Sequence, residues 1–123
     1  MANPNIVNVT SIYGNTSYLI PGTTGATTWT ALTPTSGTVN KINNIVASNV
    51  TGSNATVTVA INSAAGGSGT SYRLIYQVTV PVNASIVIVD KSTAFYLGEA
   101  QSIVVTVGTS SAIELTASYE AIT

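Results

Sequence analysis

The stretch Val78–Glu120, VTVPVNASIVIVDKSTAFYLGEAQSIVVTVGTSSAIELTASYE, decides the fold of this 123-residue chain. Apolar and polar residues alternate along 103–107 and again along 113–120, and the Gly/Ser-rich segment 108–111 separates the two runs. Alternation with a period of two on both sides of such a turn is typical of half-buried antiparallel strands. We therefore predict a hairpin of two strands here, covered by a second sheet that the rest of the chain supplies.

The residues of this stretch that we expect to face inward are large and aliphatic. They are Ile86, Ile88, Ile103, Val105, Ile113 and Leu115. Tyr72 and Tyr119 continue the apolar alternation of their own strands, so we place both in the core as well. Binding is then expected outside this stretch, in the N-terminal third and at the loop tips.

Short strands are also predicted upstream of this stretch, separated by turn signals. They cover residues 6–13, 17–20, 26–33, 56–62 and 72–80, with a turn at Gly14-Asn15 and a flexible loop tip at 64–70. Between 39 and 49 the pattern is irregular, because Ile42 and Ile45 are three residues apart. This spacing fits a helical turn, but a β-bulge at Asn43-Asn44 would also return both side chains to one face, and we prefer the bulge.

About eight or nine short strands, with turns roughly every 8–12 residues, predict an all-β fold. We expect a single antiparallel β-sandwich of jelly-roll-like form, built from one domain over residues 1–123. Residues 1–12 are expected to form an extended N-terminal arm or an edge strand.

Charged side chains make up only 6% of the chain, with three basic and four acidic residues. An average soluble domain has about 25%. Because net charge keeps monomers apart, so neutral a surface predicts an assembly that covers much of it, with a small neutral monomer as the alternative. A net charge of −1 argues against a nucleic-acid partner, and no apolar run reaches the ~20 residues that span a bilayer.

The sequence offers little for catalysis, since it contains no histidine and no cysteine. Glu114 and Glu120 share one predicted strand face but lie some 20 Å apart at about 3.3 Å per residue. Glu99 is the other acid that the fold could bring near one of them. No loop contains the paired acids that calcium prefers. We predict no enzyme activity, no cofactor and no metal, with a carboxylate hydrolase as the least favoured reading.

Aromatic residues are the best candidates for binding a partner, because they contribute large contact areas at interfaces. Trp29, within a polar threonine-rich run, is our first candidate interface residue, and Tyr13, Tyr18 and Arg73 complete the set. The alternative is a carbohydrate-binding or adhesion module, in which Trp29 and exposed tyrosines stack on sugar rings.

Residues 39–123 carry a pattern of strands and turns that resembles a known family. Its elements are the strands 45–49 and 56–59, Val80-Pro81, the small polar turn 83–85, the apolar run Ile86–Lys91, the aromatic hook Phe95–Ile103 and the ending Ser118–Ile122. The pattern is similar to that of small β-sandwich virion proteins of tailed bacteriophages, including capsid decoration (cement) proteins and tail or neck components.

This resemblance implies a non-enzymatic protein that binds the major capsid protein or another virion protein. It also implies a homo-oligomer, with a trimer favoured, located in the virion at the capsid surface rather than the tail. The N-terminus MANPNIVNV has neither the basic nor the apolar region of a secretory signal, so we expect synthesis in the host cytoplasm.

Overall fold

The computed structural model describes residues 8–123, which form nine β-strands and two short 3-10 helices. The strands are β1 (Ile12–Leu19), β2 (Thr27–Thr28), β3 (Val39–Asn49), β4 (Ala55–Asn62), β5 (Ser71–Val80), β6 (Ser85–Val89), β7 (Phe95–Leu97), β8 (Ser102–Val107) and β9 (Ile113–Ile122). The 3-10 helices are η1 (Thr30–Leu32) and η2 (Lys91–Thr93). The all-β class is therefore confirmed.

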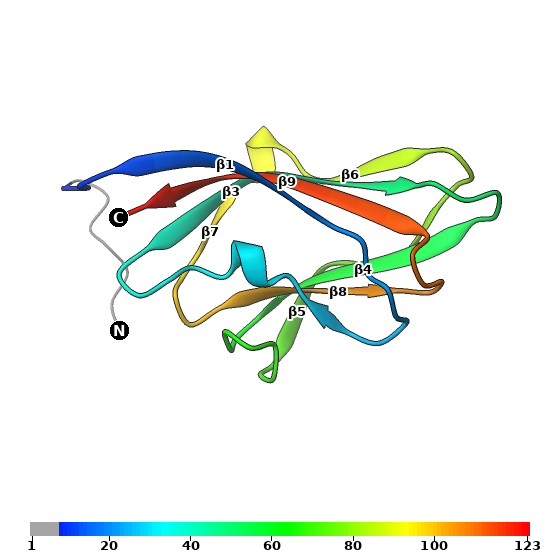
Figure 1. Cartoon of the computed structure of the whole chain (residues 1–123), viewed down its shortest axis with the longest axis horizontal. Coiled ribbons are helices and arrows are strands. Elements are labelled where there is room, and N and C mark those ends of the chain that lie inside the picture. Colours follow the sequence, from blue (N-terminus) through cyan, green and yellow to red (C-terminus); the bar gives the residue numbers. More distant parts are fainter. Residues whose placement is uncertain (1–7) are drawn as a thin grey trace.

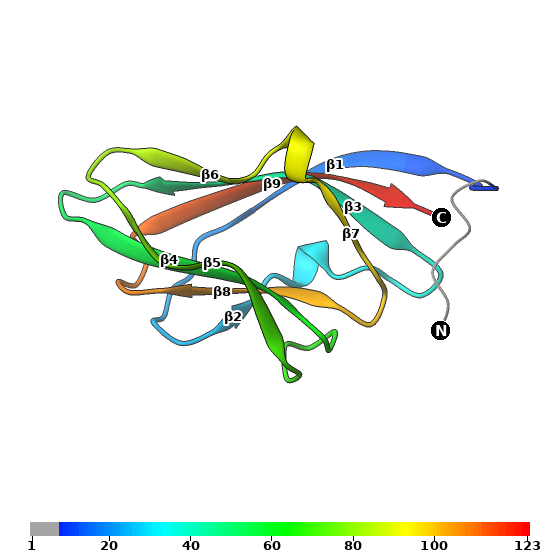
Figure 2. The ribbon, with the colours of Figure 1, turned by 180° about the vertical axis from the view of Figure 1, so that it is seen from behind.

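The strands form two antiparallel sheets that pack face to face (Figure 1). Sheet A has the order β1-β9-β3-β6, with β7 also paired to β3, and sheet B has the order β2-β8-β4-β5. Seen from behind, β6 and β7 lie on the same side of β3 and together form one edge of sheet A (Figure 2). Two facing sheets with these strand orders, in which β6 and β7 share one edge position, make a jelly roll, so the predicted sandwich has the expected form.

The predicted hairpin between 103–107 and 113–120 is wrong. Both segments are strands, but β8 belongs to sheet B and β9 to sheet A, so the connection crosses from one sheet to the other. The backbone of this connection forms hydrogen bonds with other segments of the chain. Gly108 N–H donates to Thr56 O at 3.0 Å, and Ser111 N–H donates to Pro21 O at 2.8 Å. Alternation shows which face of a strand is buried, but it does not show which strand is the neighbour.

The core between the sheets contains most of the aliphatic residues that the sequence placed there. Ile103, Val105, Ile113 and Leu115 are fully buried, which confirms those predictions. Three others are half-buried and pack against the core from its margin: Ile86, Ile88 and Tyr119. Tyr72 was placed wrongly, since it is 65% exposed.

Tyr72 is exposed because it lies near the tip of the β4–β5 hairpin, which projects beyond the sandwich (Figure 1). The register shifts on both sides of Val59, and Gln77 adopts a φ of 48°. Each one-residue shift moves the following side chains to the other face of a strand. Strict alternation along 72–80 therefore does not describe β5.

The β-bulge predicted at Asn43-Asn44 is confirmed. The pairing of β3 with β9 skips Asn43, so that Ile42 lies opposite Tyr119 and Asn44 lies opposite Ser118. Asn44 Oδ1 accepts a hydrogen bond from the Ser118 N–H at 2.9 Å, which satisfies a donor that the bulge would otherwise leave open. The extra residue returns Ile42 and Ile45 to the same face, and both are fully buried.

The N-terminal strand differs from the prediction. β1 is one continuous strand over Ile12–Leu19, and Gly14-Asn15 lies inside it, opposite Glu120 and Tyr119 of β9. A Gly-Asn pair favours turns in isolation, but here the sheet neighbour determines its conformation. Of the arm predicted over 1–12, residues 1–7 lie outside the described residues.

Two further segments are corrected. The strand expected over 26–33 is reduced to the two residues of β2 and is followed by the 3-10 helix η1. The loop 64–70 is tied down by Asn62, whose Nδ2 donates to Gly69 O and Ser71 Oγ. Asn62 Oδ1 accepts from the N–H groups of Ala64 and Gly69, so this buried amide holds a loop that was predicted to be flexible.

Candidate interaction surface

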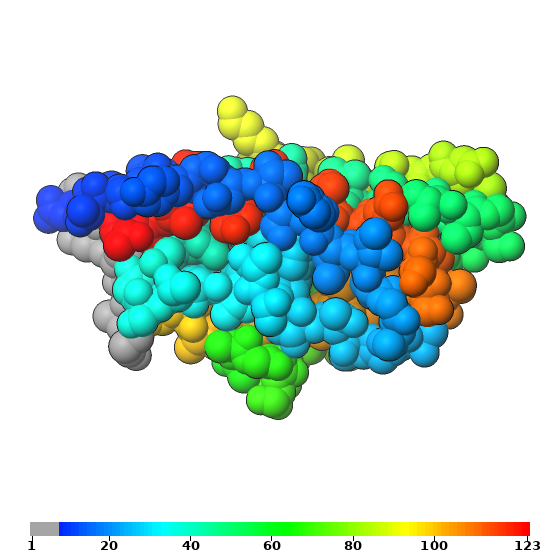
Figure 3. All heavy atoms as spheres, in the orientation of Figure 1, coloured from blue at the N-terminus to red at the C-terminus, as the bar shows by residue number. Residues whose placement is uncertain are grey.

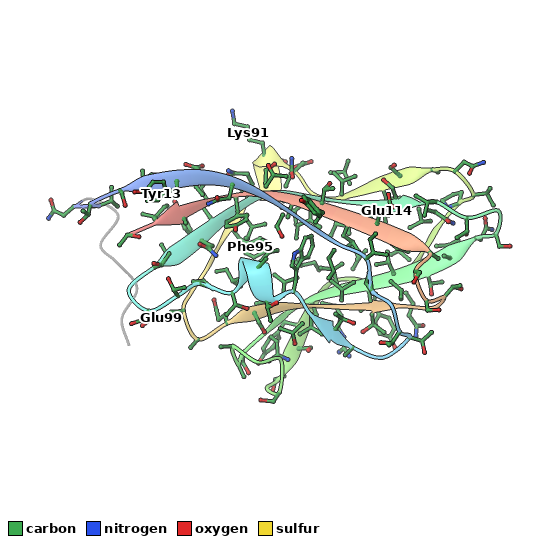
Figure 4. All side chains as sticks on the ribbon, viewed as in Figure 1. Tyr13, Lys91, Phe95, Glu99 and Glu114 are labelled. Atoms are coloured by element: carbon green, nitrogen blue, oxygen red, sulfur yellow. The ribbon has the colours of Figure 1, made fainter. Side chains whose placement is uncertain are left out.

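The carboxylates do not gather into a catalytic pair. Figure 4 shows Glu99 and Glu114 towards opposite ends of the molecule. Glu99 Oε2 accepts a hydrogen bond from the Gly37 N–H at 2.6 Å, and Glu120 Oε1 accepts from Asn43 Nδ2 at 3.0 Å. Within residues 8–123 no group of three or more acidic, histidine or cysteine side chains is placed to hold a metal ion. The structure thus gives no positive indication of catalysis.

Asp90 has a structural role at the start of η2. Its Oδ1 accepts hydrogen bonds from Ser92 Oγ at 2.6 Å and from the N–H groups of Ser92 and Thr93. The Thr93 hydroxyl donates to this carboxylate and also accepts a hydrogen bond from the Asp90 N–H, which completes a capping box. The Ser92 hydroxyl first, and then these N–H groups, hold the pKa of Asp90 below its ordinary value.

Trp29 lies in the core and not on the surface. Its side chain is 1% exposed, and its Nε1 donates to Ser17 Oγ at 3.0 Å. The Trp29 N–H also donates to Ile103 O, which fixes the residue over sheet B. The prediction of Trp29 as an interface residue is corrected: Thr30 beside it is exposed, but the indole belongs to the core between the sheets.

Tyr13 and Tyr18 are exposed on β1, as an interface role requires. Tyr18 is 79% exposed and Tyr13 64%, and the apolar neighbours Ile12 and Ile20 are about half exposed. Ile12, Tyr13 and Tyr18 lie on the edge strand of sheet A, whose other side is bonded to β9, and Ile20 directly follows this strand. The sequence indicated the residues, but only the fold shows that they share an unpaired edge.

Arg73 lies in the other sheet, on β5. Its guanidinium carbon is 5.3 Å from the centre of the Tyr76 ring, within the distance of a cation–π contact. Tyr72 and Tyr76 are both exposed beside it. The candidate residues are therefore not one patch: Tyr13 and Tyr18 lie on β1, Arg73 lies on β5, and Trp29 lies in the core.

A pocket of about 460 Å³ lies at the bulge of β3. Lys41, Asn43, Asn44 and Glu120 line it together with Lys91 and Ala94. It is found where β3 has no edge neighbour, because β7 pairs with residues up to Ile42 and β6 pairs from Ile45 onward. This pocket was not predicted from the sequence, in which the bulge at Asn43-Asn44 is the one signal that points to it.

Two of the three basic residues of the chain thus meet at this pocket. Lys91 projects from η2 away from the sandwich (Figure 4), and Lys41 lies opposite Glu120 on β9 and opposite Tyr96 on β7. Tyr96 is half exposed. The lining is mostly polar and charged, and Tyr96 is the cross-strand neighbour of Lys41, one of the lining residues.

Comparison with known proteins gives little further information. No protein-family model matches the chain, and no curated protein matches it. Among solved structures, the chain is similar to the virus-like particle of the extra small virus of the giant freshwater prawn Macrobrachium rosenbergii, solved by cryo-EM. The TM-score is 0.45 with 15% sequence identity, over 98% of this chain and 86% of that one. That structure is a viral particle, and not specifically a protein of a tailed phage.

No helix within residues 8–123 has the length and apolar character needed to cross a membrane.

Proposed function

We propose that this chain is a structural protein of a virus particle and that it acts by contacting other virion proteins. The observation that supports this most is the strand order of the two sheets, because jelly rolls of this kind build viral capsid domains as well as lectin domains. A fold alone does not determine a function, so the surface must also be suited to contacts with other virion proteins.

The surface fits an assembled protein. Among residues 8–123, eleven large hydrophobic side chains are exposed, including Tyr13, Tyr18, Tyr72 and Tyr76, while the whole chain has only seven charged residues. Exposed aromatic residues are enriched at interfaces, and charged residues are depleted at interface cores. A surface of this composition favours mostly uncharged interfaces with neighbouring proteins.

Within this class we propose a capsid decoration (cement) protein of a tailed phage, bound to the lattice of the major capsid protein. The support is the strand and turn pattern of residues 80–122, which resembles that family. The capsid surface is favoured over the tail or neck, and a homo-oligomer over a monomer.

The test is detection of the chain in purified particles by mass spectrometry, followed by gold labelling with an antibody in electron microscopy. We expect the protein to co-purify with particles in high copy number and to label the head. Its absence from the particles would overturn the virion role, whereas a low copy number with label on the tail would overturn only the decoration role.

A second measurement addresses the chemistry of the contact. Purified chain, added back to particles that lack it, should bind almost equally at low and high salt, because exposed charge pairs are screened by salt and apolar contacts are not. A large loss of binding at high salt would contradict an uncharged interface.

A carbohydrate-binding module is the second candidate, and the pocket at the β3 bulge favours it. Asn43, Asn44 and Lys41 provide polar groups, and Tyr96 lies beside them for stacking on a sugar ring. Trp29 takes no part in this version, because it is buried. A glycan array tests it: specific hits that Tyr96→Ala abolishes would support it, and an array without hits would exclude it.

A further inference from the structure

The two sheets have four edges, and three of them have features that discourage pairing with another strand. The β2 edge is two residues long, and the β6/β7 edge is interrupted by η2. The β5 edge is irregular at Gln77 and carries Arg73. Short length, interruption, bulges and charge are the means by which natural sheets protect their edges.

β1 has none of these features. Its eight residues pair with β9 in one unbroken register, and they include no charged residue and no proline. Figure 3 shows β1, in blue, along the rim of the molecule that faces the viewer, with no other described segment across it. A long, regular, neutral edge of this kind is suited to pairing with another strand.

The hydrogen bonds to β9 show which backbone groups of β1 are open. Ser11 both donates to and accepts from Thr123, so these two residues form a hydrogen-bonded pair. In an antiparallel ladder such pairs alternate with pairs that point their N–H and C=O groups the other way. The residues that direct these groups to the open side are therefore the even-numbered ones: Ile12, Gly14, Thr16 and Tyr18.

We propose that β1 pairs with β1 of a second copy of this chain, antiparallel and about a two-fold axis at Asn15. In this register Ile12 lies opposite Tyr18 of the second copy, and Gly14 lies opposite Thr16 of the second copy. It is the register in which all four open residues find a partner, with about eight hydrogen bonds between the copies.

The side chains favour a second copy over an unrelated strand. The register places exposed Ile12 and Tyr18 across from each other twice, and aromatic with β-branched is a favourable cross-strand pair. Gly14 leaves room opposite Thr16, and with no charge on either strand no like charges meet. A two-fold contact requires this self-complementarity, because the same patch serves both copies.

The result is a continuous ten-stranded sheet across two copies, in the order β6-β3-β9-β1-β1-β9-β3-β6, with β7 paired to β3 beside β6 in each copy. The contact uses one edge only, so it leaves the other surfaces of each copy open to virion partners or to a three-fold association. It does not depend on the proposed function, and it holds whether or not the chain belongs to a virus particle.

The first test uses the full chain and measures mass in solution by light scattering after size exclusion. We expect wild type at a multiple of two of the 12.5 kDa chain. Tyr18→Lys should halve that mass, because a lysine at the edge opposes pairing. The matched control is Val87→Lys on β6, which introduces the same charge at a 63% exposed valine on the opposite edge and should leave the mass unchanged.

The second test uses the absence of cysteine in the chain. In the proposed register Asn15 faces Asn15 of the second copy in a non-hydrogen-bonded pair, with Cα atoms about 4.5 Å apart. This distance permits a disulfide. Asn15→Cys should therefore form a covalent dimer on oxidation, and Tyr13→Cys, which faces Ser17 of the second copy, should not.

Three outcomes would overturn the proposal. Wild type could be monomeric at every concentration. Alternatively, an oligomer could keep its mass in Tyr18→Lys while Asn15→Cys fails to cross-link, in which case another surface joins the copies. In the third, β1 binds a strand of a different virion protein while the purified chain remains a monomer.

Discussion

The two edges of sheet A are built from similar lengths of chain but differ in regularity. On one side β1 runs through eight residues without a break, and on the other β6 and β7 are separated by η2. The interruption coincides with the bulge of β3, since Asn43 and Asn44 have no partner in either edge strand. The comparison shows how a bulge in an inner strand can close one edge of a sheet while the opposite edge stays open for assembly.

The charged side chains also distinguish the β1 edge of sheet A from the β6/β7 edge. The first charged side chain of the sequence is Lys41, so that β1 and everything before β3 contain none. The interrupted edge has Asp90 in its capping box and Lys91 projecting outward (Figure 4). Each of the following predictions tests one side of this contrast.

The largest effect is expected where β1 is attached to the core. Trp29→Ala removes a buried indole and its hydrogen bond to Ser17 Oγ, so we expect a loss of about 3–5 kcal/mol in the free energy of unfolding. Denaturant titration measures this loss. The control is Tyr72→Ala on β5, away from the proposed contact, which should change stability by no more than about 0.5 kcal/mol because the ring is 65% exposed. Equal losses in the two variants would contradict the assignment of Trp29 to the core.

An intermediate effect is expected at the bulge. Asn44→Ala leaves the Ser118 N–H without its acceptor, so we expect a loss of about 1–3 kcal/mol in the free energy of unfolding. Asn43→Ala removes only the bond to Glu120 Oε1 and should cost about 1 kcal/mol or less. The same titrations compare the two, and a larger loss for Asn43→Ala would show that Asn44 does not hold the bulge.

The smallest effect is expected at Asp90, on the exposed cap of the interrupted edge. Its folded pKa is lowered, so its charge stabilises the fold at neutral pH, and this contribution disappears as the pH falls through the folded pKa. Asp90→Ala should lower the melting temperature slightly at neutral pH, and the difference from wild type should shrink in acid. Asp90→Asn keeps an acceptor without the charge. The part of the pH dependence of stability that Asp90 contributes should therefore be absent from this variant. A difference that grows in acid would contradict the assigned sign.

Much of the fold is predictable because burial leaves a local pattern. The sequence identified β4, β8 and β9 and the bulge at Asn43, since the spacing of Ile42 and Ile45 permits few ways of burying both. It did not identify strand pairing, because alternation carries no information about neighbours. The segment from Ile103 to Leu115 therefore gave the right strands in the wrong arrangement.

The interaction surface was predicted only in part, for a related reason. Tyr13 and Tyr18 were identified as aromatic residues in a neutral chain, but their position on an open edge follows from the pairing of β1 with β9. Trp29 was misplaced because its threonine neighbours are polar, whereas the core that buries it and its hydrogen-bond partner Ser17 are distant in sequence. Lys41 and Lys91 meet only after β3 and η2 are folded together.

The most direct test of the open edge is hydrogen exchange at the amides of β1, measured by NMR at increasing protein concentration. The amides bonded to β9, such as that of Asn15, should be protected throughout. Those of Gly14, Thr16 and Tyr18 should exchange rapidly in the dilute chain and become protected as the copies associate. If these three amides stay unprotected where the measured mass is that of an oligomer, β1 is not the strand that joins the copies.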